Sequence, residues 1–136
     1  MSNIYNLFKF LEKKKGTKTP IEVKFAYAPD ELTDEDLNVE GYLNLSHTKI
    51  TSLPDNLEVG GDLGLAVTKI TSLPDNLQVG GNLMLNHLKI SSIPNNLKVG
   101  RSLFLDNTPL AEKYTKEEIR KIIEDKGGYV KRDIYV

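Results

Sequence analysis

Few side chains in this sequence are placed to do chemistry, and the two histidines show why. His47 and His87 occupy the same place in two copies of an internal repeat, and Val67 occupies that place in the copy between them. If each copy adds one strand to a sheet, two strand spacings of ~4.8 Å hold the histidines ~10 Å apart. A single metal ion with ligand bonds of ~2 Å does not bridge that distance. We therefore interpret both histidines as surface residues where a strand runs into a loop.

The carboxylates do not form a catalytic pair either. Acid pairs for glycoside hydrolysis lie ~5–9 Å apart on one face, whereas Asp62 and Asp106, the acids at outward strand positions, are two copies and a register shift apart. The sequence has no cysteine, no Gly-x-Ser-x-Gly motif, no phosphate-cradling loop and no zinc-ligand spacing. We predict no catalytic, metal-ligating or cofactor-binding residues, no cofactor, and a protein that is not an enzyme.

The residues that remain are those that the repeated strands turn outward, a face that we call the strand wall. Tyr42, Met84 and Phe104 are large and apolar, and folding does not require them on a solvent-facing surface. Gly64 and Ala66 leave a shallow dip between larger neighbours. The alternative interpretation is that the terminal segments cover part of this wall. The predicted protein-binding residues are Tyr42, Asn44, Asp62, Gly64, Asn82, Met84, Ser102 and Phe104.

A 20-residue repeat positions these residues. Its copies occupy residues 39–58, 59–78 and 79–98, and a fourth copy starts at residue 99 and ends after residue 110. A fixed period of this length predicts a solenoid, in which each unit buries its apolar side against its neighbours. The aligned apolar positions are Val39, Val59, Val79 and Val99; Leu43, Leu63, Leu83 and Leu103; Leu45, Leu65, Leu85 and Leu105; Ile50, Ile70, Ile90 and Leu110; Leu53, Leu73 and Ile93; and Leu57, Leu77 and Leu97.

The local chemistry of one copy predicts one coil. Leu-x-Leu is the period-two pattern of a strand with one buried face, and the paired glycines before it permit a tight turn. Thr48, Thr68 and Thr108 share one position, where a buried hydroxyl can bond the backbone of the loop. Proline and Asp-Asn exclude a regular helix from the second half of the copy. We expect an α/β solenoid, a right-handed coil of about four short repeats whose strands line one wall, with a helix and a strand as a cap at each end.

The residues Leu43-Asn-Leu45-Ser-His-Thr48-Lys-Ile50 and their copies resemble the leucine-rich repeat consensus L-x-L-x-x-N-x-L, with Thr in place of the usual Asn. The Leu-Pro-x-x-Leu segments and the short period are similar to the repeats of secreted bacterial effector proteins. Residues 39–110 also resemble small proteins of bacteriophages and large DNA viruses. The resemblance implies the fold, in a family that binds many unrelated ligands. The ubiquitin-ligase activity of such effectors needs a cysteine that this chain lacks.

The segments on either side of the repeats predict caps. Residues 2–15 predict an amphipathic helix that ends in lysines, either a lid on the solenoid or a basic anchor. Residues 21–27 alternate as a strand does, and the acidic residues 30–36 predict a solvated turn or, alternatively, a contact patch. Thr115 and Glu118 have capping-box spacing at the start of a helix, and residues 129–136 predict a final strand. We expect one domain over residues 1–136, with caps at 1–38 and 111–136 and repeats at 39–110.

The composition of the chain limits the kinds of partner that we expect it to bind. The formal net charge of −1 disfavours general binding to nucleic acid or anionic membrane. No run of 18 apolar residues occurs, so no membrane span is expected. The amino-terminal lysines follow the apolar positions rather than precede them, unlike a secretory signal. We expect a cytoplasmic protein, in the host cytoplasm if it is encoded by a phage.

The main functional hypothesis is a non-catalytic module that binds another protein through the strand wall. If the viral resemblance holds, it would act in a bacterial host as an adaptor or inhibitor of a host protein. The first alternative is a homo-oligomer that assembles through the edges of its terminal strands. The second alternative is weak electrostatic binding to nucleic acid or membrane through lysine and arginine residues near both ends of the chain.

Overall fold

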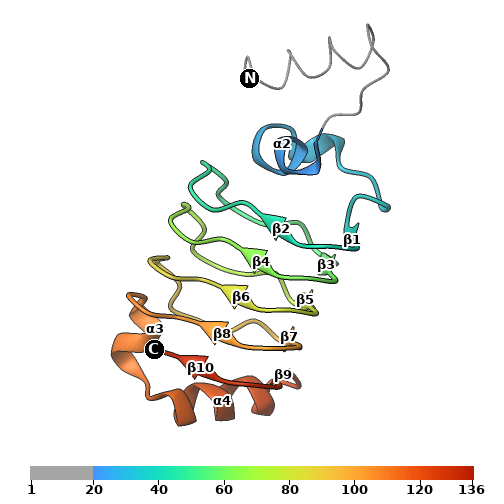
Figure 1. Cartoon of the computed structure of the whole chain (residues 1–136). Helices are drawn as coiled ribbons and strands as arrows, with labels where there is room; N and C mark the ends of the chain where they lie inside the picture. Colours follow the sequence, from blue (N-terminus) through green and yellow to red (C-terminus); the bar gives the residue numbers. More distant parts are fainter. Residues whose placement is uncertain (1–19) are drawn as a thin grey trace, which may run out of the picture.

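The computed structural model describes residues 20–136, which form a β-solenoid of about three turns with helices at its ends (Figure 1). Each turn contributes a short strand to each of two sheets, and neighbouring strands are parallel. One sheet contains, in spatial order, β1 (Asn38–Val39), β3 (Glu58–Val59), β5 (Gln78–Val79), β7 (Lys98–Val99) and β9 (Tyr129–Val130). The other contains β2 (Leu43–Asn44), β4 (Leu63–Gly64), β6 (Leu83–Met84), β8 (Leu103–Phe104) and β10 (Ile134–Tyr135).

The coils share one apolar interior. Leu43, Leu63 and Leu83 stack in register across β2, β4 and β6, and all three are fully buried. Among the aligned apolar positions only Val39 and Leu73 are partly exposed, and both still pack against the core. The prediction of a solenoid is therefore confirmed. Burial of these leucines, at roughly 1.5–3 kcal/mol for each side chain, is the main force that holds one coil on the next.

Each turn carries two strands, whereas the repeat pattern predicts one. The additional strands β3, β5 and β7 contain the aligned valines, and Val59, Val79 and Val99 are buried. A strand of two residues has no period to read in a sequence. Only the recurrence of a β-branched residue marks this position in the sequence.

Glycines at the corner between the two strands of a turn let successive turns approach closely. A Cβ atom added to Gly60, Gly80 or Gly100 would lie 2.3, 2.3 or 2.2 Å from the backbone oxygen of the preceding turn. Glycine is therefore required at these three corners, because any side chain there would push one turn away from the one before it.

The aligned threonines hold the loop that follows each strand of the second sheet. The hydroxyls of Thr48, Thr68 and Thr108 donate to the carbonyl oxygens three residues earlier, at 2.7, 2.9 and 2.6 Å. Where Leu88 replaces threonine, the leucine side chain is buried instead. The predicted role of the threonine hydroxyls is confirmed.

Two positions in each turn have a left-handed backbone conformation. Asparagine and histidine tolerate a positive φ better than branched residues do, and these two types occupy all but one of the positions. The exception is Val67, with a φ of 56°. The left-handed residues are His47, Val67, His87 and Asn107 in one column and Asn56, Asn76 and Asn96 in the other.

The strand predicted at residues 21–27 is wrong, because this segment is the helix α2 (Ile21–Tyr27), followed by the 3-10 turn η1 (Pro29–Glu31). Its alternation of apolar residues also fits a helix, since Ile21 and Phe25 are four residues apart and share one face. Phe25 is buried in the core and Ile21 packs beside it. The helix predicted at residues 2–15 lies outside the described residues.

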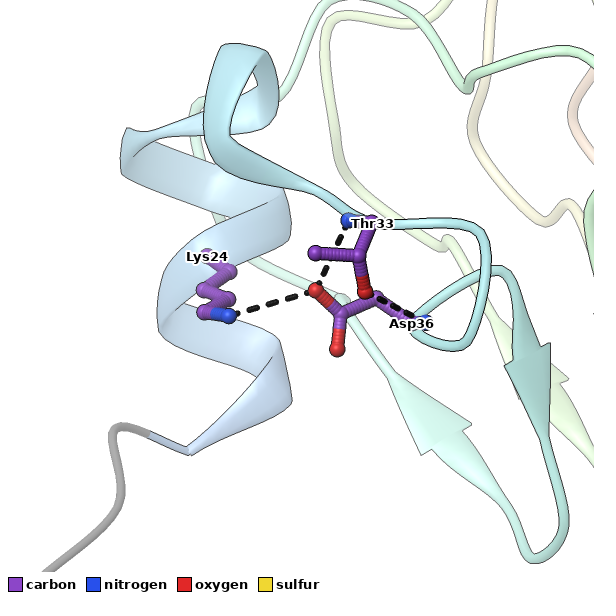
Figure 2. Close-up of polar contacts among 3 residues, drawn as sticks. All are labelled: Lys24, Thr33 and Asp36. Carbon is purple, nitrogen blue, oxygen red and sulfur yellow. Dashed lines mark hydrogen bonds and ion pairs between the residues drawn. The ribbon is translucent and has the colours of Figure 1, made fainter.

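A polar cluster joins α2 to the first coil (Figure 2). The Asp36 carboxylate accepts hydrogen bonds from the Thr33 amide at 3.0 Å and from the Lys24 ammonium at 3.2 Å. In return, the Asp36 amide donates to the Thr33 hydroxyl. The Thr33 amide lowers the pKa of Asp36 below its usual range; partial burial opposes this, and Lys24 adds to the lowering. Part of the acidic segment is therefore structural rather than a simple solvated turn.

The carboxyl-terminal cap begins with two helices, α3 (Pro109–Lys113) and α4 (Lys116–Asp125). The predicted capping box is present: the Glu118 amide donates to the Thr115 hydroxyl at 3.2 Å, and the Thr115 amide donates to the Glu118 carboxylate at 3.0 Å. On α4, Ile119 and Ile123 are buried against the end of the solenoid.

The final strand predicted at residues 129–136 is two strands, one in each sheet. β9 pairs with β7 and β10 pairs with β8, so that Val130 lies beside Val99 and Ile134 beside Leu103. The chain therefore repeats the first half of the coil once more, after the two helices. α4 packs against both β9 and β10 at this end of the solenoid (Figure 1).

Candidate functional site

The strand wall is the outward face of the sheet that contains β2, β4, β6, β8 and β10. Parallel pairing in register places the second residue of each strand in one column that crosses the coils. Because the first residue of each strand is a buried leucine or isoleucine, this second residue points to the opposite side of the sheet. The column consists of Asn44, Gly64, Met84, Phe104 and Tyr135.

A second column of predicted binding residues forms a hydrogen-bonded ladder. An Asp62 carboxylate oxygen accepts from the Asn82 amide at 2.7 Å, and the Asn82 side-chain oxygen accepts from the Ser102 amide at 2.9 Å. The Ser102 hydroxyl accepts from the Asp133 amide at 3.4 Å. Each side chain thus satisfies a backbone amide of the next turn. These three residues have a structural role that the sequence did not indicate, and Ser102 is only 8% exposed.

The end of the wall near the carboxyl terminus is aromatic. The rings of Phe104 and Tyr135 are stacked, with centroids 4.7 Å apart and planes at 15°. Tyr135 is 45% exposed and covers part of the Phe104 ring, so a terminal segment does cover part of the wall while extending it. Tyr135 was not among the predicted residues. The signal was present, because Val130, Ile134 and Tyr135 have the spacing of Val99, Leu103 and Phe104, interrupted by the helices.

A hollow of about 210 Å³ lies at the opposite end of the wall. It lies over Gly64, where the sequence predicts a dip, and Gly64 is itself buried. The ring of Tyr42 at its edge is 71% exposed, which is the highest exposure among the large apolar side chains of residues 20–136. The remaining lining residues are Leu43, Asn44, Ser46, Asp62 and Met84.

The eight predicted binding residues therefore divide into three groups. Tyr42, Asn44, Gly64 and Met84 lie around the hollow, together with Asp62, which also belongs to the ladder. Asn82 and Ser102 belong to the ladder, and Phe104 lies in the aromatic stack. All eight lie in the strands of one sheet or directly before them.

The histidines and acids of the described part of the chain do not converge. His47 and His87 are exposed in the loop column with positive φ. Within residues 20–136, no group of three or more histidine, cysteine, aspartate or glutamate side chains is arranged to hold a metal ion. In the same residues, no helix has the length and apolar character needed to cross a bilayer. What the site offers is a shaped surface of aromatic, thioether, amide and carboxylate groups.

The chain was compared with protein-family models, with curated proteins and with solved structures, and none of these matched it.

Proposed function

We propose that this protein is a non-catalytic module that binds another protein through the strand wall. The observation that carries the proposal is the aromatic and thioether surface of one sheet, around a hollow with a glycine floor. Tyr42 is 71% exposed, and Phe104 and Met84 are partly exposed. The interior is complete without these side chains, so stability does not explain their position. Exposed aromatic and methionine side chains are enriched at protein interfaces.

The solenoid itself is proposed to be a right-handed leucine-rich-repeat coil of about four repeats with helical caps. The support is the L-x-L-x-x-T-x-I pattern together with the threonine hydroxyls. Thr48 and Thr68 bond the backbone of the loop, at the place where the leucine-rich repeat consensus has asparagine. In this proposal the sheet of β1, β3, β5, β7 and β9 takes the place that helices occupy on the outer side of longer repeats.

The size of the wall limits what it binds. Strands ~4.8 Å apart make a wall ~20 Å wide across five strands, and the outward residues of a turn, such as 42–46, extend it ~15 Å in the other direction, which gives ~300 Å². A standard interface uses about 800 Å² on each partner. A single extended segment of a partner fits the wall, whereas a whole domain would also need the caps. The resemblance to phage proteins makes an adaptor or inhibitor of a host protein in the bacterial cytoplasm our proposal for its setting.

A triple variant with Tyr42→Ala, Met84→Ala and Phe104→Ala tests the wall. Its matched control carries Glu58→Ala, Gln78→Ala and Lys98→Ala, which change an equivalent column of the other sheet. We expect pull-down from bacterial lysate, read by mass spectrometry, to lose the partner with the wall variant and to keep it with the control. Both variants are first shown to be folded by circular dichroism. A folded wall variant that captures the partner as the wild type does would refute the proposal.

Self-assembly is a second candidate, because β2 and β10 are the end strands of their sheet within the described residues. An end strand presents unpaired backbone groups that a second copy can pair with. Light scattering over a concentration series distinguishes the two functions. We expect a monomer at all concentrations if the strand wall is the binding surface, and a growing mass if the end strands pair.

A further inference from the structure

The hollow over Gly64 combines three kinds of group that together indicate the chemistry of its occupant. An exposed aromatic ring, a thioether and a carboxylate, from Tyr42, Met84 and Asp62, line a space of about 210 Å³. We propose that this hollow binds an arginine side chain of the partner's segment. The inference rests on the proposed function and specifies what the wall recognises.

The carboxylate of Asp62 provides a negative charge for a cationic occupant. One of its oxygens accepts a hydrogen bond from the Asn82 amide at 2.7 Å. In the next two turns the same ladder position is filled by the neutral residues Asn82 and Ser102, which accept equivalent amides. The ladder therefore needs an oxygen and not a charge. Within residues 20–136 no ion pair includes Asp62, so its negative charge is available to an incoming cation.

The shape of the hollow near Gly64 favours a long, thin side chain. A Cβ atom added to Gly64 would lie 3.0 Å from the Asn44 side-chain oxygen and 3.1 Å from the Ser46 hydroxyl. The Asn44 and Ser46 side chains therefore lie against Gly64, and a methyl group at this position would press on both. Glycine leaves room for the methylene stem of a long side chain, which can pack beside the Met84 thioether while its charged head reaches the rim.

The aromatic ring of Tyr42 at the rim of the hollow favours arginine over lysine as the occupant. Tyr42 occupies the ladder column of the first turn, and its ring is 71% exposed. A guanidinium is planar and stacks on an aromatic face while donating hydrogen bonds to a carboxylate, whereas an ammonium is a point charge with a strong hydration shell. An apolar occupant would leave the charge of the Asp62 carboxylate desolvated without a cation to balance it. Arginine satisfies all three lining groups at once.

The test uses the full chain and the methyl resonance of Met84 in carbon-13 NMR, assigned by its loss in Met84→Leu. The probes are the acetylated and amidated pentapeptides Gly-Ser-Arg-Ser-Gly and its citrulline counterpart, which has the same shape without the charge. We expect a saturable shift with the arginine peptide and a response roughly fivefold weaker with the citrulline peptide. Equal responses to the two peptides, or no shift with either at millimolar concentration, would overturn the proposal.

Asp62→Asn provides the matched variant, because asparagine makes the same ladder bond one turn later. We expect this variant to remain folded and to respond to the arginine peptide only as strongly as the wild type responds to citrulline. An unchanged arginine response would contradict the proposal. Gly64→Val fills the hollow without removing the charge, and we expect it to abolish the shift with both peptides; a Gly64→Val variant that still responds would count against the hollow as the site.

The partner-capture experiment separates this inference from the proposed function. If Asp62→Asn and Gly64→Val capture the partner like the wild type while the triple wall variant does not, the arginine site is wrong and the wall remains the binding surface. If the triple variant still captures the partner, the wall itself is wrong.

Discussion

Val67 adopts a left-handed backbone conformation, with a φ of 56°, at a position where the neighbouring turns have His47, His87 and Asn107. A β-branched residue is crowded in this conformation, which costs about 1–2 kcal/mol for ordinary L-residues. The side chain is 46% exposed and makes no contribution to the core that would offset the strain. The valine therefore lowers the stability of the second turn.

We expect Val67→Asn to raise the free energy of unfolding by about 1 kcal/mol, because asparagine tolerates a positive φ. Urea denaturation of the two proteins measures the difference. His47→Asn is the control, since it replaces one tolerant residue with another at the equivalent position. A Val67→Asn protein less stable than the wild type would show that the backbone at this position is not strained.

The surroundings of Asp36 predict that the free energy of unfolding depends on pH. Its pKa is lowered by the Thr33 amide and by Lys24, so the folded state holds the ionised form more strongly than the unfolded chain does. The resulting stabilisation is complete above the unfolded pKa and is lost as the pH falls through the lowered folded pKa.

We expect Asp36→Asn to lower the free energy of unfolding by about 1 kcal/mol at pH 7, since the amide keeps one acceptor but loses the charge. Below the folded pKa of Asp36 the difference from the wild type should shrink. Urea denaturation at pH 7, 4 and 2.5 measures this. Asp34→Asn, which changes an exposed acid, is the control. A difference that is constant with pH would contradict the proposed charge effect.

At the scale of the elements, the glycine corners decide how closely the turns stack. Gly80 has the Gly60 oxygen 2.3 Å from the position of a Cβ atom, whereas Gly41, in the first described turn, has no atom within 4 Å of that position. Glycine therefore has a strict steric role at the Gly80 corner, whereas Gly41, which aligns with Gly61 and Gly81, has none in the first turn.

We expect Gly80→Ala to lower the free energy of unfolding by about 2–3 kcal/mol, because the methyl group forces two turns apart. Gly41→Ala is the control, because it changes a corner glycine with open space beside it, and it should change stability by less than about 0.5 kcal/mol. Thermal or urea unfolding of both variants gives the comparison. Equal stability of the two variants would show that the corner adapts more readily than the geometry indicates.

The elements that could be predicted from the sequence are those specified by local or repeated signals. The capping box of Thr115 and Glu118 needs only two residues three positions apart. The buried leucines repeat often enough to fix which face is interior. The helix at residues 21–27 was mispredicted, since Ile21 and Phe25 fit both a strand and a helix, and packing against the first coil decides between them.

The sequence predicts where the residues of the site lie, but it does not predict the role of each residue. The Leu-x-Leu pattern correctly assigns Gly64 and Met84 to one column. The hydrogen bonds made by Asp62 and Asn82 depend on where the next turn places its amides, which no single copy of the repeat specifies. Tyr135 was missed because α3 and α4 lengthen the interval before the last half-turn.

At the scale of the whole molecule, each turn contacts mainly the turn before it and the turn after it. Hydrogen bonds such as those from Leu43 to Asp62 and from Leu63 to Asn82 repeat at an interval of one turn. The stability of such an array is approximately the sum of turn and interface contributions. Deletion of one complete turn therefore leaves the remaining turns in register, whereas deletion of a fraction of a turn does not.

We expect deletion of residues 59–78 to give a folded, cooperative protein with lower stability, because residue 79 continues the pattern of residue 59 in register. Deletion of residues 59–68, which removes half a turn, should give an unfolded chain. Circular dichroism and urea denaturation compare the two. An unfolded product from the full-turn deletion would show that the copies are not interchangeable.

The ladder of Asp62, Asn82 and Ser102 also has a consequence for synthesis. Each side chain receives an amide from a turn that is later in the sequence. A ribosome releases the amino-terminal turns first, so every newly emerging turn meets an acceptor that is already in place. The turns can therefore be added in the order of synthesis, and the last half-turn, β9 and β10, completes the structure after the preceding turns have formed.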